Sequence, residues 1–393
     1  MSEPAKKPGQ QPEGYQPKKP EIVGMVEAAQ GQTEAQGAPQ AVPAARGGGK
    51  QKIDFNIPFS VFAGTNFVNC FASTYMYLEG IGVGDTSDQY GDNNQYFCLF
   101  DTMCGRSALR RRFSDEPTEM QMLIEGEVED LYGICGTDDT VDFLFGFAGY
   151  AYRKLTDSKD FMDAIRASID AGRPVIAKVK AGKGLFRVIT GYDGKKLLGP
   201  DYKHAHHQPK KPPKYDELAA LYIIGGKTAP RYTLSDALER IRQVMEYNIK
   251  EKLWDGCIEK MGGWLMFPSA DGWEQAGAEE RKARLARLKN VMWYAMNCHT
   301  FGETFRNRYH EELRNPAFDG LWKKISGLCY SIDALIYGID CLNGQLDWSK
   351  IHSAMVPGIS AMIVMTLEKV KQMDVELLGA IIHAQEILRE ESA

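Results

Sequence analysis

The chain has 393 residues, of which 44% are hydrophobic and 25% are charged, with a net charge of -5 and an isoelectric point near 5.9. These values are typical of a soluble globular protein with two or three structural units, and they argue against a general nucleic-acid-binding protein. No apolar run is long enough to cross a bilayer, and the first residues lack a signal-peptide pattern. The sequence therefore predicts a cytoplasmic protein without a membrane partner.

The first 52 residues differ in composition from the rest of the chain. They are rich in Pro, Gly, Gln, Ala, Lys and Glu and contain few aromatic residues. Such a segment buries too little apolar surface to offset the entropy lost on ordering. We therefore expect residues 1–52 to be a disordered leader that serves as a linker or tether.

Residues 53–227 combine helical patterns with short strand patterns. The predicted helices lie at 69–79, 118–132 and 157–171. The predicted strands lie at 174–179, 185–190, 196–198 and 221–224. Gly80 and Gly172 follow two of the helices, and further glycines mark turns between the strands. Helices that precede an antiparallel sheet indicate an α+β domain.

Residues 228–393 lack strand patterns and are expected to form an all-α helical C-terminal domain. Thr233 followed by Asp236 is typical of a capped helix start. The predicted helices lie at 234–253, 278–298, 305–314, 318–342 and 350–389, the last with breaks near Pro357 and Met373.

The eight cysteines are spread along the chain without the paired spacing of a metal site. Most stand beside apolar or aromatic residues, as Cys98 does between Phe97 and Leu99. In a chain without an export signal, such thiols are expected to be buried and reduced. We therefore expect no metal and no cofactor.

Cys70 is the strongest candidate nucleophile, because it stands at the start of a predicted helix. The positive end of the helix dipole and the free N–H groups there favour a thiolate. Asn66 and Asn69 are candidate amide donors for an oxyanion hole. The alternative is that Cys70 is a buried small residue in a helix packed among aromatic side chains.

A general base for Cys70 is absent from the strand where it is expected. No histidine occurs between Met1 and Lys203, and Leu185-Phe186 occupies the expected place. The tract with His204, His206 and His207 follows the predicted sheet. It is a candidate metal ligand set or a source of a replacement base, with His207 as the first choice, and a solvated loop is the alternative.

Two acidic residues and an arginine-rich stretch complete the polar candidates. Asp193 or Asp201 is a candidate to orient a base, although an ordinary turn explains Asp193 equally well. Arg106 and the run Arg110-Arg111-Arg112 either bind an anionic group such as phosphopantetheine or form a solvated helix face.

Four segments resemble one enzyme family and occur in a fixed order. They are the Asn69-Cys70 helix start, Gly-Phe-Ala-Gly-Tyr-Ala-Tyr-Arg at 146–153, Gly-Arg-Pro-Val-Ile at 172–176 and Ile-Thr-Gly-Tyr-Asp-Gly at 189–194. Together they resemble the N-terminal domain of the butirosin-biosynthesis acyltransferase family, which is similar to papain-like and bacteriocin-processing cysteine peptidases. The resemblance covers about residues 60–227. It implies a papain-like domain with Cys70 as nucleophile and Asp201 as the orienting acid.

Two main hypotheses of function follow, and a structural or interaction protein that works through its helical domain is a third. The first is a cysteine-dependent acyltransferase, or an amide-bond enzyme, that acts on a small amine or on an acyl group held by a carrier protein. The second is a catalytically inactive protein that binds a small molecule or a partner in an aromatic cleft. Its candidate binding residues are Phe67, Tyr75, Phe145 and Tyr150, with Asp193 beside them. The sequence leaves the oligomeric state open.

Overall fold

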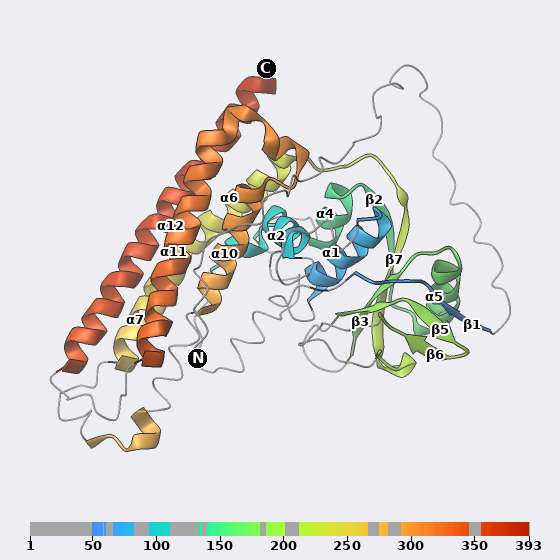
Figure 1. The fold of residues 1–393 in the computed structure, drawn as a ribbon, viewed down its shortest axis with the longest axis horizontal. Helices are drawn as coiled ribbons and strands as arrows, with labels where there is room; N and C mark the ends of the chain where they lie inside the picture. The colour runs from blue at the N-terminus through green and yellow to red at the C-terminus, as the bar shows by residue number, and fades with distance from the viewer. Residues whose placement is uncertain are drawn as a thin grey trace, which may run out of the picture. The chain divides into compact units, whose positions relative to one another are not determined.

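The computed structural model describes residues 49–57, 59, 66–81, 94–110, 131, 134–135, 140–180, 186–200, 212–265, 275–281, 292–345 and 355–392. These residues form helices and antiparallel sheets in the first part of the chain and helices alone in the last part (Figure 1). The predicted α+β class and the helical C-terminal region are thereby confirmed. The predicted helix at 118–132 lies outside the described residues except for Leu131.

Two antiparallel sheets are present among the described residues. The first has the strand order β2-β7-β3-β4 and the second has the order β1-β5-β6. The strands are β1 (Lys50–Lys52), β2 (Tyr150–Leu155), β3 (Val175–Val179), β4 (Phe186–Ile189), β5 (Gly191–Asp193), β6 (Lys196–Leu198) and β7 (Leu218–Lys227). Strand β1 lies inside the segment 1–52 that the composition assigns to a leader, and of that segment only residues 49–52 are described.

Strand β3 lies in the interior of the first sheet. Val175, Ile176 and Ala177 have no exposed surface. The strand pairs with β4 on one side and with β7 on the other, and it also contacts α1 (Phe67–Leu78) and α5 (Phe161–Asp170). A run of consecutive apolar residues is typical of such a buried strand, which explains why it was recognisable in the sequence.

Helix α1 (Phe67–Leu78) begins and ends with the local signals that the sequence contains. The side-chain oxygen of Asn66 accepts a hydrogen bond from the Asn69 N–H at 2.8 Å and caps the first turn. Gly80 has a φ of 67°, a left-handed conformation that glycine adopts without strain. The predicted helix at 69–79 is confirmed, with a start two residues earlier.

Helix α5 follows a single 3-10 turn and ends before Gly172, which has a φ of 74°. Three elements of this region carried no clear pattern in the sequence: α2 (Asn94–Met103), α4 (Thr140–Phe147) and β2. Strand β2 contains the exposed residues Arg153 and Lys154 side by side, so it does not alternate between apolar and polar residues.

The described residues of the C-terminal part form helices and 3-10 turns. The elements are α6 (Leu234–Lys250), α7 (Leu253–Leu265), α10 (Met292–Asn307), η7 (Glu311–Arg314), η8 (Pro316–Phe318), α11 (Asp319–Gln345) and α12 (Val356–Ser392). Helix α11 packs against α10 and α12, and Figure 1 shows α11 and α12 side by side. The capping box of Thr233 and Asp236 at the start of α6 is confirmed.

Two predictions for the helical part are wrong. The helix expected at 305–314 is instead the end of α10 followed by the 3-10 turn η7, and Arg308 between them has a left-handed φ of 53°. Helix α12 runs without the breaks expected near Pro357 and Met373. Pro357 lies in the first turn of α12. An N–H group at this position would have no carbonyl partner within the helix, so proline removes no helical hydrogen bond.

The two parts share one hydrophobic core. Helix α2, from the region 53–227, packs against α10 and α6 of the helical region. Buried residues of both regions, from Ile53 to Ala384, take part in one hydrophobic cluster. None of the described helices combines the length and the apolar character needed to cross a membrane.

Candidate functional site

The first turn of α1, which carries Cys70, packs into a cluster of aromatic rings. The Phe67 ring lies 6.0 Å from Phe71, 6.3 Å from Phe145, 5.3 Å from Phe186 and 5.1 Å from Tyr222, measured between ring centroids. These partners come from α1 itself, α4, β4 and β7. The sheet and α4 therefore enclose the start of α1.

Cys70 is the fourth residue of α1 and has no exposed surface. Its backbone N–H donates to the Asn66 carbonyl at 3.3 Å, so this amide belongs to the helix. Burial raises the pKa of the Cys70 thiol to about 12, and the nearby Arg187 guanidinium lowers it by a smaller amount. An isolated thiol has a pKa near 8.5, so burial disfavours the thiolate of Cys70. The environment therefore keeps the thiol neutral.

Asn66 and Asn69, the candidate oxyanion donors, are also buried, with 1% and 0% of their surface exposed. The side-chain oxygen of Asn66 is engaged in capping α1 through the Asn69 N–H. The positions of both residues are therefore explained by the helix start, and the structure places them beside Cys70 within one helical turn.

Leu185-Phe186 stands where the resemblance implies a histidine, and of this pair the structure describes Phe186. It is the first residue of β4, is 3% exposed, and its ring packs against Phe67 of α1. Asp201 and His207 lie outside the described residues, as do Leu185, His204 and His206. The histidines among the described residues are His299, His310 and His383, which all lie in the helical part.

The candidate binding residues lie in different surroundings. Phe145 has no exposed surface and stacks on Tyr152 with 4.3 Å between ring centroids. Tyr75 and Tyr150 lie together, 6.4 Å between centroids, near the end of α1. The Tyr150 hydroxyl donates to Glu79 at 2.6 Å. Asp193 is exposed at the end of β5.

Arg106 and Arg110 bind carboxylates of this chain, which differs from both interpretations of the arginine-rich stretch. Arg106 contacts Asp101 at 2.5 Å. Arg110 has no exposed surface and its Nη2 contacts the Asp374 carboxylate of α12 at 2.8 Å. Arg110 is therefore an internal structural residue rather than a solvated side chain or an exposed anion ligand. Arg111 and Arg112 lie outside the described residues.

Comparisons with known proteins do not indicate a function for this chain. No family model, curated protein or solved structure matches the chain. Within the described residues, no group of three or more His, Cys, Asp or Glu side chains is arranged to hold a metal ion.

Proposed function

We propose that this chain is a non-catalytic binding protein built on a papain-like cysteine-enzyme scaffold. The observation that carries the proposal is the burial of Cys70. Its thiol has no exposed surface and a pKa near 12, whereas a nucleophilic cysteine needs a lowered pKa and access to its substrate. The first turn of α1, which holds this thiol, packs into the ring cluster around Phe67.

The relation to papain-like enzymes is supported by the arrangement of α1 and β4. The helix that carries Cys70 packs against the antiparallel sheet, and strand β4 contacts this helix directly. An ancestral histidine at the place of Phe186 would have faced α1 from that strand. Replacement of such a base by phenylalanine removes proton transfer and adds apolar surface to the core.

The competing hypothesis is an active acyltransferase that takes an acyl group from a carrier protein or a small donor and passes it to an amine. It requires the sulfur of Cys70 to reach the acyl carbon, and it requires a base such as His207. A structure in which Cys70 is fully enclosed favours the non-catalytic hypothesis.

Labelling with N-ethylmaleimide at mildly acidic pH, followed by peptide mass spectrometry, distinguishes the two hypotheses. Cys341 is exposed on α11 and serves as the internal reference. We expect Cys341 to react well before Cys70, because modification of Cys70 requires opening of the core. The Cys341→Ser variant should lose the early label, and Cys70→Ser should keep it. Faster labelling of Cys70 than of Cys341, lost in Cys70→Ser, would overturn the proposal.

A further inference from the structure

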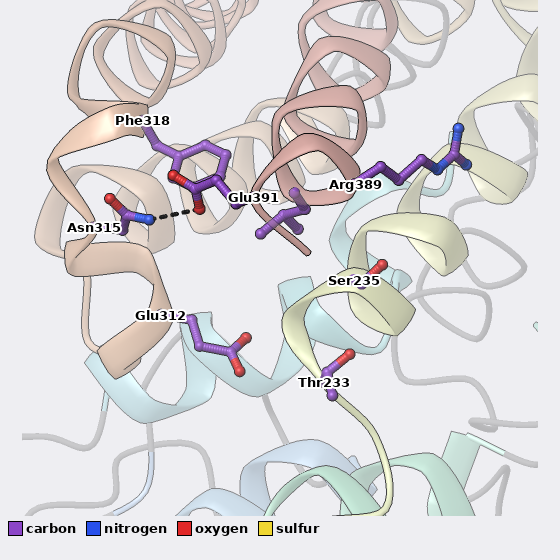
Figure 2. A pocket seen from close by; sticks show the side chains of 8 residues that line it. Thr233, Ser235, Glu312, Asn315, Phe318, Arg389 and Glu391 are labelled. Atoms are coloured by element: carbon purple, nitrogen blue, oxygen red, sulfur yellow. Dashed lines mark hydrogen bonds between the residues drawn. The ribbon is translucent and has the colours of Figure 1, made fainter. Parts of the chain in front are cut away.

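Two side-chain hydrogen bonds that join helices of the C-terminal part respond differently to pH. Figure 2 shows the bond from Asn315 Nδ2 to Glu391 Oε2, 2.9 Å long, which joins the turn before α11 to the last turn of α12. The amide donor of this bond does not titrate. Between α10 and α11, His299 Nδ1 lies 3.3 Å from Asp333 Oδ2. An imidazole changes its charge near neutral pH, so this second bond depends on pH.

The His299 ring lies between carboxylates from both helices. Glu303, one turn further along α10, has its Oε1 4.0 Å from His299 Nε2. Each ring nitrogen therefore has a carboxylate oxygen within 4.0 Å. The His299 side chain is 41% exposed, whereas those of Asp333 and Glu303 are 22% and 19% exposed. Water screens such half-buried carboxylates less than it screens carboxylates on an open surface.

Tyr330 and Arg306 hold this cluster in place. The Tyr330 hydroxyl of α11 donates to Glu303 Oε1, and the Tyr330 ring meets the His299 ring edge-on with 5.7 Å between centroids. Arg306 of α10 lies 3.6 Å from the same Glu303 oxygen, and its guanidinium stands over the Tyr330 ring at 5.5 Å. The carboxylate beside His299 Nε2 is therefore fixed by contacts from both helices.

The charges around His299 favour the imidazolium ion. The hydrogen bond with Asp333 raises the pKa of His299 above the ordinary 6.5, burial opposes this increase, and Glu303 adds to it. Arg306 lowers the pKa by a smaller amount. Elements α2 and η2 also pack on α10, and their charged residues Asp101 and Arg106 pair with each other.

We propose that His299 is a pH-sensitive clamp between α10 and α11, in which the imidazolium joins Asp333 to Glu303 and the helix pair loosens when the ring gives its proton to solvent. A raised pKa in the folded chain means that this stabilisation is fully present below pH 6.5 and is lost as the pH rises through the folded pKa. The clamp is remote in sequence from Cys70 and depends on none of its chemistry, so it goes beyond the function proposed above.

Urea denaturation of the full chain at about pH 5.5 and at about pH 8.5 tests the clamp. His299→Gln should lower the urea midpoint at least about twofold more at the lower pH than at the higher pH. His383→Gln is the matched control, because His383 Nδ1 also lies 3.3 Å from a carboxylate, but its partner Glu386 is on the same helix, α12. Burial lowers the pKa of His310, which gives the opposite pH dependence, but His310 is present in every variant and cancels in the comparison.

Nuclear magnetic resonance of the chain with ¹³C-labelled histidine rings measures the titration directly. The His299 resonance, identified by its loss in His299→Gln, should titrate above pH 6.5. Asp333→Asn should lower this midpoint, since asparagine keeps an acceptor for the ring N–H and loses the charge. A midpoint at or below 6.5, a midpoint unchanged in Asp333→Asn, or equal pH dependence in His299→Gln and His383→Gln would each overturn the inference.

Discussion

Replacement of Arg110 by alanine is expected to lower the free energy of unfolding by about 3–5 kcal/mol, because it leaves a buried carboxylate without its cation. The Arg110 side chain is fully buried, and its Nη1 also donates to the Ser107 carbonyl at 2.9 Å. Asp374, its partner, is 5% exposed and accepts a second bond from Trp254 Nε1 at 2.9 Å. This network joins the segment after α2 to α7 and α12.

Urea denaturation followed by far-ultraviolet circular dichroism measures the effect. Arg242→Ala is the matched control, because Arg242 pairs with Glu239 and Glu246 at a half-buried position of α6. Ion pairs that water still reaches contribute up to about 1 kcal/mol. The double variant Arg110→Met with Asp374→Leu removes both charges and should recover most of the lost stability. If Arg110→Ala costs no more than Arg242→Ala, the buried pair does not hold the helices together as described.

The distance along the chain between Arg110 and Asp374 explains why the sequence did not predict this pair. The two residues are 264 positions apart, and no local pattern connects them. Features that depend on neighbours in sequence were predicted well, as with the capping box of Thr233 and the helix end at Gly80. Local hydrogen bonds and left-handed glycines act within a few residues, so composition and spacing reveal them.

At the candidate site, too, features set by neighbouring residues were predictable, whereas features set by residues distant in sequence were not. That Cys70 begins a helix follows from its neighbours, and this part was predictable. The pKa of its thiol is raised by burial, and the rings of Phe145, Phe186 and Tyr222 pack on Phe67 in the same helical turn from three other elements. Only the assembled fold brings these rings around the first turn of α1.

Phe67→Ala is expected to cost about 3–5 kcal/mol of unfolding free energy, because it leaves a cavity in the ring cluster beside Cys70. Phe67 has no exposed surface and contacts rings from α4, β4 and β7, which cannot all close around a methyl group. Phe67→Leu fills more of the space and should cost less. Tyr337→Ala is a suitable control, since the Tyr337 side chain on α11 is 54% exposed and should contribute little.

The same variant distinguishes a filled core from an aromatic binding cleft. A cleft wall can lose a ring with a small effect on folding and a large effect on ligand affinity, whereas a core residue shows the opposite pattern. In the core interpretation, Phe67→Ala also makes Cys70 react faster with N-ethylmaleimide, because the cavity and the lower stability both expose the thiol. Unchanged stability together with unchanged protection of Cys70 would show that the ring cluster does not enclose the sulfur. The non-catalytic interpretation would then lose its main support, since that interpretation depends on the same enclosure.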